Sequence, residues 1–181
     1  KFFKGEQPAG ILHVAVFWGF LTLALQVKTM FLRGWFPDFV IPGLHGTTLG
    51  GIYALLKDIF QTTVFVGVWV LLFRWLVIKP KRLYGILPAE KRLHSQSHGE
   101  AILILFFIMN IMTSGFLYDA GRMVAMQNDP AILMEAAWAP VTSMIAGWIG
   151  NDPERGLFFS QLGWWVHNCI ILVFLNLLPR S

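Results

Sequence analysis

The sequence predicts an all-α integral membrane protein, a bundle of four transmembrane helices plus one short interfacial or re-entrant helix. Of its 181 residues, 56% are hydrophobic and 13% are charged, whereas soluble domains are typically about 45–50% apolar. Eight tryptophans and sixteen phenylalanines suit a bilayer, because aromatic rings favour its two interfaces. Four apolar stretches approach the roughly 20 residues that cross a bilayer.

The first two apolar stretches cover residues 9–32 and 50–78. The second stretch contains Lys57 and Asp58 near its start and Arg74 near its end. Charged side chains near the ends of a span can extend to the polar interface. We therefore expect these three residues to lie near the membrane surfaces, and we predict that both stretches span the membrane.

The third and fourth stretches, residues 101–118 and 157–178, contain no carboxylate or ammonium group in their interior. Between them, residues 135–150 are apolar, but they are too few for a span and are interrupted by Pro140. This pattern favours an interfacial or re-entrant helix. No linker or repeat divides the chain, so residues 1–181 are predicted to form one membrane domain.

The distribution of charge predicts the orientation of the bundle. The segment 79–98 carries five lysines and arginines against one glutamate, and such segments remain in the cytoplasm. Both termini are then predicted to be cytoplasmic, and residues 33–48 and 119–155 to be exterior. In the second exterior segment, Asp119 and Arg122 are expected to form a pair at the end of a helix.

Composition also excludes several functions. The formal net charge of +4 comes from lysines and arginines clustered in a few places. It therefore indicates topology and contact with lipid headgroups, and no basic patch with interleaved aromatic residues predicts nucleic-acid binding. The single cysteine, Cys169, excludes an internal disulfide and an iron–sulfur cluster held by this chain alone, because such clusters need about four cysteines.

Two histidines, His13 and His167, lie within predicted spans. Ionisable residues in a span usually face the bundle interior and serve a pathway, a partner or a metal. Haem iron is one interpretation, because haem in a helical bundle takes axial imidazoles from different helices. The alternative is that each histidine bonds to a neighbouring helix, a contact worth about 0.6–2 kcal/mol. The two positions differ by roughly 10 Å in depth, so a separate iron for each histidine also stays open.

Several stretches of the sequence resemble a known family. The stretches ILHVAVFWGF, FRWLVIKPKRL and WWVHNCIILVFLNLLPRS resemble the cytochrome b membrane domain related to the gamma subunit of respiratory nitrate reductase. The version fused to heterodisulfide-reductase-like iron–sulfur proteins, which includes electron-transfer-flavoprotein:menaquinone oxidoreductases, is more similar. The resemblance implies that His13 and His167 are haem ligands. The nitrate reductase subunit has a second histidine on the first of these helices, where this chain has Leu23.

The resemblance implies a membrane domain with one or two haem b groups, the membrane part of a quinone-linked oxidoreductase complex in the bacterial inner membrane. It would pass electrons between menaquinone and a cytoplasmic iron–sulfur protein or domain, or an electron-transfer flavoprotein. Arg74 is expected to contact a haem propionate, since propionates favour arginine. The protein is expected to continue beyond Ser181 with another histidine ligand and an iron–sulfur domain. The competing hypothesis is a haem-free scaffold or a proton or ion transport subunit.

The remaining histidines are weaker candidates. His94 and His98 are one helical turn apart and could hold a metal, but no third ligand is evident nearby, so a solvated basic loop is favoured. His45 lies in the glycine-rich stretch PGLHGTTLGG. It could bind quinone or shuttle protons, but an ordinary loop histidine is the favoured interpretation.

Overall fold

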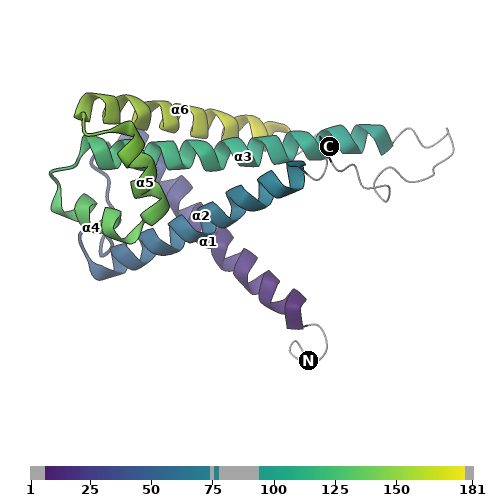
Figure 1. The fold of residues 1–181 in the computed structure, drawn as a ribbon, viewed down its shortest axis with the longest axis horizontal. Coiled ribbons are helices and arrows are strands. Elements are labelled where there is room, and N and C mark those ends of the chain that lie inside the picture. Colours follow the sequence, from purple (N-terminus) through teal and green to yellow (C-terminus); the bar gives the residue numbers. More distant parts are fainter. Residues whose placement is uncertain (1–6, 74–75, 78–93, 178–181) are drawn as a thin grey trace.

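The structure is a computed structural model that describes residues 7–73, 76–77 and 94–177; the side chains of 7–16, 20, 94–101 and 177 lie outside the described part. Every regular element in this part is a helix, as the sequence predicts, and the helices form an elongated bundle (Figure 1). The elements, in chain order, are α1 (Gln7–Trp35), α2 (Thr48–Phe73), α3 (His94–Ala125), α4 (Pro130–Trp138), α5 (Pro140–Ile149) and α6 (Pro153–Leu177).

Three of the described helices are long and apolar enough to cross a membrane: α2, the Ile102–Ala125 part of α3, and the Pro153–Asn176 part of α6. The pair α4 and α5 adds a fourth candidate if the two are counted as one broken span. α1 contains the predicted first stretch, residues 9–32, in one continuous helix. The helical fold class is therefore confirmed, with three or four helices that meet the criteria for a span.

The prediction of one short helix over residues 135–150 is wrong in detail. Two short helices, α4 and α5, meet at Ala139 with a bend of 117°. Pro140 causes the break, because it lacks the N–H that would continue α4 but is well suited to the first turn of α5. A bend of this size turns the chain back on itself, which fits the predicted re-entrant segment.

Polar residues define where several helices begin. The Thr47 hydroxyl accepts a hydrogen bond of 3.2 Å from the backbone N of Gly50 at the start of α2. At the start of α4, the Asp129 carboxylate accepts a hydrogen bond of 2.9 Å from the backbone N of Ala131. At the start of α6, the Asp152 carboxylate accepts one of 3.0 Å from the backbone N of Glu154. These caps satisfy backbone donors that have no partner within the helix. They explain why helices begin at these points in an otherwise apolar chain.

α3 and α6 pack closely side by side along most of their length (Figure 1). Three glycines allow this approach: Gly121 on α3, and Gly156 and Gly163 on α6. A Cβ atom at any of them would come closer than 3.0 Å to backbone atoms of the opposite helix. Small residues at such contacts are typical of helix pairs in membranes, where association depends on close packing.

α1 is attached to the bundle through its C-terminal half. The indole N–H of Trp164 on α6 donates a 2.7 Å hydrogen bond to the Met30 carbonyl, and the indole ring lies against Gly34. The Tyr53 hydroxyl of α2 donates to the Thr22 carbonyl at 3.3 Å. The N-terminal half of α1 leads away from α3 and α6 (Figure 1).

The segments predicted to be exterior lie together at one end of the bundle. The loop between α1 and α2, the turn after α3, and helices α4 and α5 all lie there, at the left of Figure 1. The described ends of α2 and α6 and the start of α3 lie toward the opposite end. The bundle therefore has two distinct ends, as expected for helices that cross a membrane in alternating directions.

Candidate functional site

His167 on α6 is buried against α3, with 3% of its surface exposed. Its Nδ1 lies 3.0 Å from the Ile111 carbonyl oxygen and 3.1 Å from the Ser114 hydroxyl. A carbonyl can only accept a hydrogen bond, so Nδ1 carries the ring hydrogen. The Ser114 hydroxyl donates its own hydrogen to the Asn110 carbonyl at 2.7 Å. The Nδ1 side of the imidazole ring is thus fixed by α3.

The other ring nitrogen, Nε2 of His167, is buried and has no hydrogen-bond partner among the described residues. With the hydrogen on Nδ1, a neutral ring leaves a free lone pair on Nε2. A buried acceptor without a partner costs about 1–3 kcal/mol. Histidines that bind metals have this arrangement, with one nitrogen donating to a carbonyl and the other free for the metal. A simple bond between helices explains Nδ1 but leaves Nε2 unexplained.

The space around His167 is shaped by Gly115 on α3 and Gln61 on α2. A Cβ atom at Gly115 would come within 2.8 Å of Gln61 Nε2 and 3.7 Å of His167 Cε1. Gln61 donates to the Met112 carbonyl at 2.9 Å, and its own Oε1 is buried without a partner in the described part. Two buried acceptor atoms therefore lie near Gly115 with no donor assigned to them.

Of the two predicted haem ligands, His13 and His167, the structure describes only the side chain of His167. The side chain of His13 lies outside the described residues, and the half of α1 that carries it leads away from α6 (Figure 1). Arg74 also lies outside the described residues, as do the side chains of His94 and His98 at the start of α3. The assignments of these residues remain predictions.

Among the described side chains, no group of three or more His, Cys, Asp or Glu residues could hold a metal ion. A bare metal site of the structural or hydrolytic type is therefore not seen in this part of the chain. Haem differs, because the macrocycle supplies four nitrogens and the protein supplies only the axial ligands. The absence of such a group among the described side chains therefore does not bear on haem.

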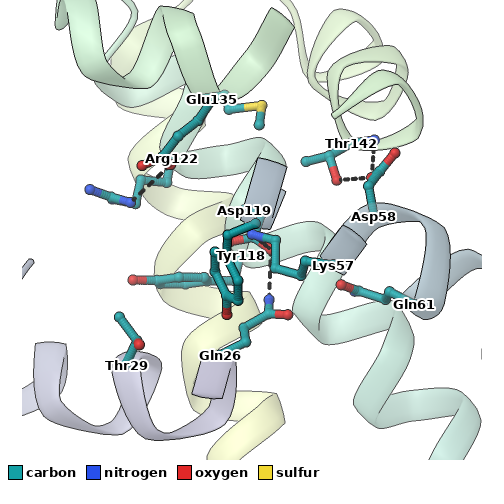
Figure 2. Close-up of polar contacts among 12 residues, drawn as sticks. Gln26, Thr29, Lys57, Asp58, Gln61, Tyr118, Asp119, Arg122, Glu135 and Thr142 are labelled. Atoms are coloured by element: carbon teal, nitrogen blue, oxygen red, sulfur yellow. Dashed lines mark hydrogen bonds and ion pairs between the residues drawn. The ribbon is translucent and has the colours of Figure 1, made fainter. Parts of the chain in front are cut away.

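A second site lies at the end of the bundle that carries α4 and α5. We call it the polar pocket, a partly open space of ≈ 50 Å³ that has room for a few water molecules. Its polar lining comes from four helices and one loop: Gln26, Thr29, Arg33, His45, Tyr53, Lys57, Tyr118, Asp119, Arg122 and Glu135. Figure 2 shows seven of them: Gln26, Thr29, Lys57, Tyr118, Asp119, Arg122 and Glu135.

The centre of the polar pocket is a buried ion pair between Lys57 on α2 and Asp119 on α3. Lys57 Nζ lies 2.9 Å from Asp119 Oδ2, and the Gln26 side-chain amide donates to the same oxygen at 2.6 Å (Figure 2). The two charged side chains are only 11% and 8% exposed. Lys57 therefore does not extend outward from the bundle, as a charged side chain near the end of a span can, because an acid on the adjacent helix holds it inside.

The predicted pairing of Asp119 with Arg122 is wrong, although Arg122 does lie in the last turn of α3. α3 continues through both residues to Ala125, and each pairs with a different partner on another helix. Arg122 Nη1 lies 4.0 Å from Oε2 of Glu135 on α4 (Figure 2). The predicted third span ends too early, because these two charges are neutralised by other helices rather than by solvent.

Asp58, the other charged residue near the start of the predicted second stretch, is also buried within the bundle. It is 1% exposed and lies next to the start of α5 (Figure 2). Its oxygens accept hydrogen bonds from the backbone N–H groups of Val141 and Thr142 and from the Thr142 hydroxyl. Asp58 therefore holds the short helices on the bundle and is not part of the polar pocket lining.

His45 in the loop between α1 and α2 lines the polar pocket. Its two ring nitrogens face two carboxylates, Asp129 and Glu135, at 3.9 Å and 3.8 Å. The sequence favours an ordinary loop histidine at this position. In the structure its acidic neighbours are Asp129, which caps the start of α4, and Glu135, within α4.

Sequence reasoning missed the polar pocket as a site. The available signal was the presence of Gln26, Lys57 and Asp119 in or directly after apolar stretches, since polar groups within a span usually pair inside the bundle. Which of them pair depends on how α1, α2 and α3 face each other, and the sequence pattern alone does not give that.

The fold and the two sites define a helical protein with three or four helices able to cross a membrane, a buried histidine with one free nitrogen, and a polar pocket at one end. No protein-family model matches the chain, and no solved structure gives a significant match.

Two curated proteins do match. The chain is 28% identical over 176 residues to an EtfAB:quinone oxidoreductase of Syntrophomonas wolfei subsp. wolfei (strain DSM 2245B / Goettingen). It is 23% identical over 185 residues to the probable iron-sulfur-binding oxidoreductase FadF of Bacillus subtilis (strain 168). The alignments cover 94% and 97% of this chain. The similarity to oxidoreductases that the sequence predicts is confirmed at this level.

The chain spans 22% of the length of each of these relatives. The matching region is thus one part of each relative, and the rest of each relative has no counterpart in the chain described here. The activities named for the whole relatives are therefore attributes of those proteins.

Proposed function

We propose that this chain is a haem b electron-transfer domain of a membrane-bound, quinone-linked oxidoreductase. It passes electrons between menaquinone and a soluble partner, which is an iron–sulfur protein or domain or an electron-transfer flavoprotein. The names of the two relatives support this proposal, since one includes quinone and the Etf proteins and the other includes iron–sulfur binding.

The observation that carries the proposal is Nε2 of His167, which is buried and has no hydrogen-bond partner among the described residues. The Ile111 carbonyl fixes the hydrogen on Nδ1, and the apolar bundle excludes water that would otherwise bond to Nε2. Coordination to haem iron would satisfy this nitrogen, so His167 would hold the haem through Nε2. A bound haem b supplies the one-electron redox chemistry, and the protein positions the haem and tunes its potential.

The remaining residues of the proposed haem site are assigned by the resemblance alone. His13 on α1 is proposed as a ligand of the same haem or of a second one. Arg74, which follows α2 in the sequence, is proposed as a partner of a haem propionate. Replacement of His13 by Ala is expected to lower the haem content, and full retention of haem would refute its assignment.

The proposed location is the bacterial inner membrane, with both termini in the cytoplasm. The basic segment 79–98 supports this orientation, because lysines and arginines next to spans remain on the cytoplasmic side. The polar pocket then lies toward the exterior face.

Reduction of a quinone takes up two protons and oxidation of a quinol releases two, so we assign the exchange of these protons to the polar pocket.

A second candidate function is a haem-free proton or ion transport subunit, or a membrane scaffold. The buried pair of Lys57 and Asp119 favours transport, because charges inside a membrane bundle often mark ion or proton pathways. This candidate leaves the free Nε2 of His167 without a role.

An optical spectrum of the purified protein distinguishes the two candidates. We expect a Soret band and an α band that appears on reduction with dithionite, and reduction of the same bands by the soluble quinol menadiol. Protein purified from haem-replete cells without a Soret band would refute the haem proposal and leave the transport candidate.

A further inference from the structure

His45 lies between two carboxylates, one on each side of its ring. Nε2 is 3.9 Å from Oδ2 of Asp129, and Nδ1 is 3.8 Å from Oε1 of Glu135. Gly43 and Gly46 flank the histidine with φ values of 81° and 68°, which are backbone conformations that glycine adopts without strain. The loop thus turns tightly on both sides of His45 and presents its ring to α4.

The two carboxylates differ in their surroundings. Glu135 lines the polar pocket together with Lys57 and Asp119. Asp129 is at the start of α4, where Oδ1 accepts a hydrogen bond from the Ala131 N–H, and its Oδ2 faces His45. Asp129 is not among the residues that line the pocket. His45 therefore lies between a carboxylate inside the pocket and one outside it.

The distances distinguish this arrangement from a fixed structural bond. Both exceed hydrogen-bond length, and Nδ1 of His45 is buried without a hydrogen-bond partner in the described part. Among the described residues, the charged groups that face His45 are Asp129, the N-cap residue of α4, and Glu135 on α4. Arg122 of α3 lies beyond Glu135, with its Nη1 4.0 Å from Glu135 Oε2. The ring is held near both acids but is bonded to neither, so a small rotation can bring either nitrogen into contact.

We propose that His45 is a proton relay between the polar pocket and the exterior end of the bundle. Protonated Glu135 gives its proton to Nδ1 of His45, and the hydrogen on Nε2 passes to the Asp129 carboxylate, which releases a proton to water. The ring then holds its hydrogen on Nδ1 and returns to the starting tautomer by rotation and exchange. One proton leaves the pocket and one reaches the solvent, and no electron moves.

The same steps in reverse carry a proton inward. Histidine suits this role because its two nitrogens can accept and donate near neutral pH. The identity of the proton donor and acceptor rests on the proposed function, in which the protons of quinone chemistry are exchanged at the polar pocket. The relay geometry itself does not depend on haem.

The direct test is ¹⁵N NMR of the detergent-purified protein with labelled histidine, recorded from about pH 5 to 8, the range in which histidine titrates. The His45 signals are identified by their loss in His45→Gln. We expect chemical shifts that show both tautomers in exchange, since a relay must populate both. A single fixed tautomer over this range would overturn the proposal.

A kinetic test uses haem reduction by menadiol in His45→Gln. We expect the rate to fall about tenfold or more, in line with loss of a group that transfers protons, and added imidazole to restore it. Dithionite, which needs no proton release at the pocket, should reduce the variant at the wild-type rate. An unchanged menadiol rate, or a slow rate that imidazole does not restore, would overturn the relay.

Asp38→Asn is the matched control, because Asp38 is an exposed acid in the same loop and should leave the menadiol rate unchanged. The two proposals fail separately. Wild-type protein without haem would refute the proposed function, while the NMR measurement would still decide on the relay.

Discussion

Asp58 on α2 caps the N-terminal end of α5, with its Oδ1 2.6 Å from the Thr142 hydroxyl. The backbone N–H groups of Val141 and Thr142 donate to the same carboxylate at 2.8 Å and 3.0 Å. α5 has no side-chain cap of its own, because Ala139 occupies that position. A carboxylate is also favoured at a helix N-terminus by the helix dipole, which explains a buried acid in an apolar span.

Replacement of Asp58 by Ala is expected to destabilise the folded protein by about 1–3 kcal/mol, because it leaves buried donors at the start of α5 without an acceptor. Thermal unfolding in detergent, followed by circular dichroism, measures the effect. Thr142→Val removes only one of the three hydrogen bonds and should cost less. Equal melting temperatures for wild type and Asp58→Ala would show that the cap does not hold α5.

The pair of Lys57 and Asp119 gives a second prediction. Lys57→Met or Asp119→Leu alone leaves one buried charge without its partner, which costs about 3–5 kcal/mol. The double variant removes both charges and should be clearly more stable than the sum of the single effects predicts. Chemical unfolding of all four proteins gives the coupling energy.

A different result would contradict the burial of Lys57 and Asp119 in the bundle. If Lys57 extended to the membrane surface, as its place in the sequence suggests, Lys57→Met would change stability by less than about 0.5 kcal/mol, and the double variant would show no coupling. That result would contradict the buried pair seen in the structure.

The close packing of α3 and α6 predicts opposite effects for two glycine substitutions. In Gly163→Ala the added methyl would lie closer than 3.0 Å to the backbone of Tyr118, so the helices must move apart and the melting temperature should fall. Gly147 on α5 has no atom within 4 Å of an added Cβ. Gly147→Ala should be neutral or should stabilise by about 0.5–1 kcal/mol, since alanine favours a helix.

Equal melting temperatures for the two variants would show that glycine at position 163 is not needed for the contact. The comparison is well matched, because each change adds one methyl group within a helix. The surroundings differ, because Gly163 is buried against α3 whereas Gly147 is exposed on α5.

The sequence predicts much of the fold because hydrophobic length is a local property. The stretch 157–178 corresponds to α6, and the interruption at Pro140 corresponds to the bend between α4 and α5. The predicted third stretch ends at residue 118, before the end of α3 at Ala125. Asp119 and Arg122 resemble the polar end of a span when taken alone, and only their partners on other helices allow the helix to continue.

The candidate sites, too, are only partly predictable from the sequence. His167 stands out in the sequence as an ionisable residue in an apolar span, but the free Nε2 depends on Ile111 and Ser114, which are more than fifty residues away in the chain. The polar pocket combines residues from α1 to α4, none of which forms a motif in sequence. Its assembly depends on how these helices face one another, which no spacing rule gives.

The account depends most on the free nitrogen of His167 as a haem ligand. The most direct test is the ratio of haem to protein in purified His167→Ala, measured by the pyridine haemochrome spectrum. His45→Gln serves as the control, because it also removes a histidine but lies at the polar pocket. We predict that His167→Ala loses at least one haem per protein while His45→Gln keeps the wild-type ratio. A wild-type haem ratio in folded His167→Ala would contradict the central claim.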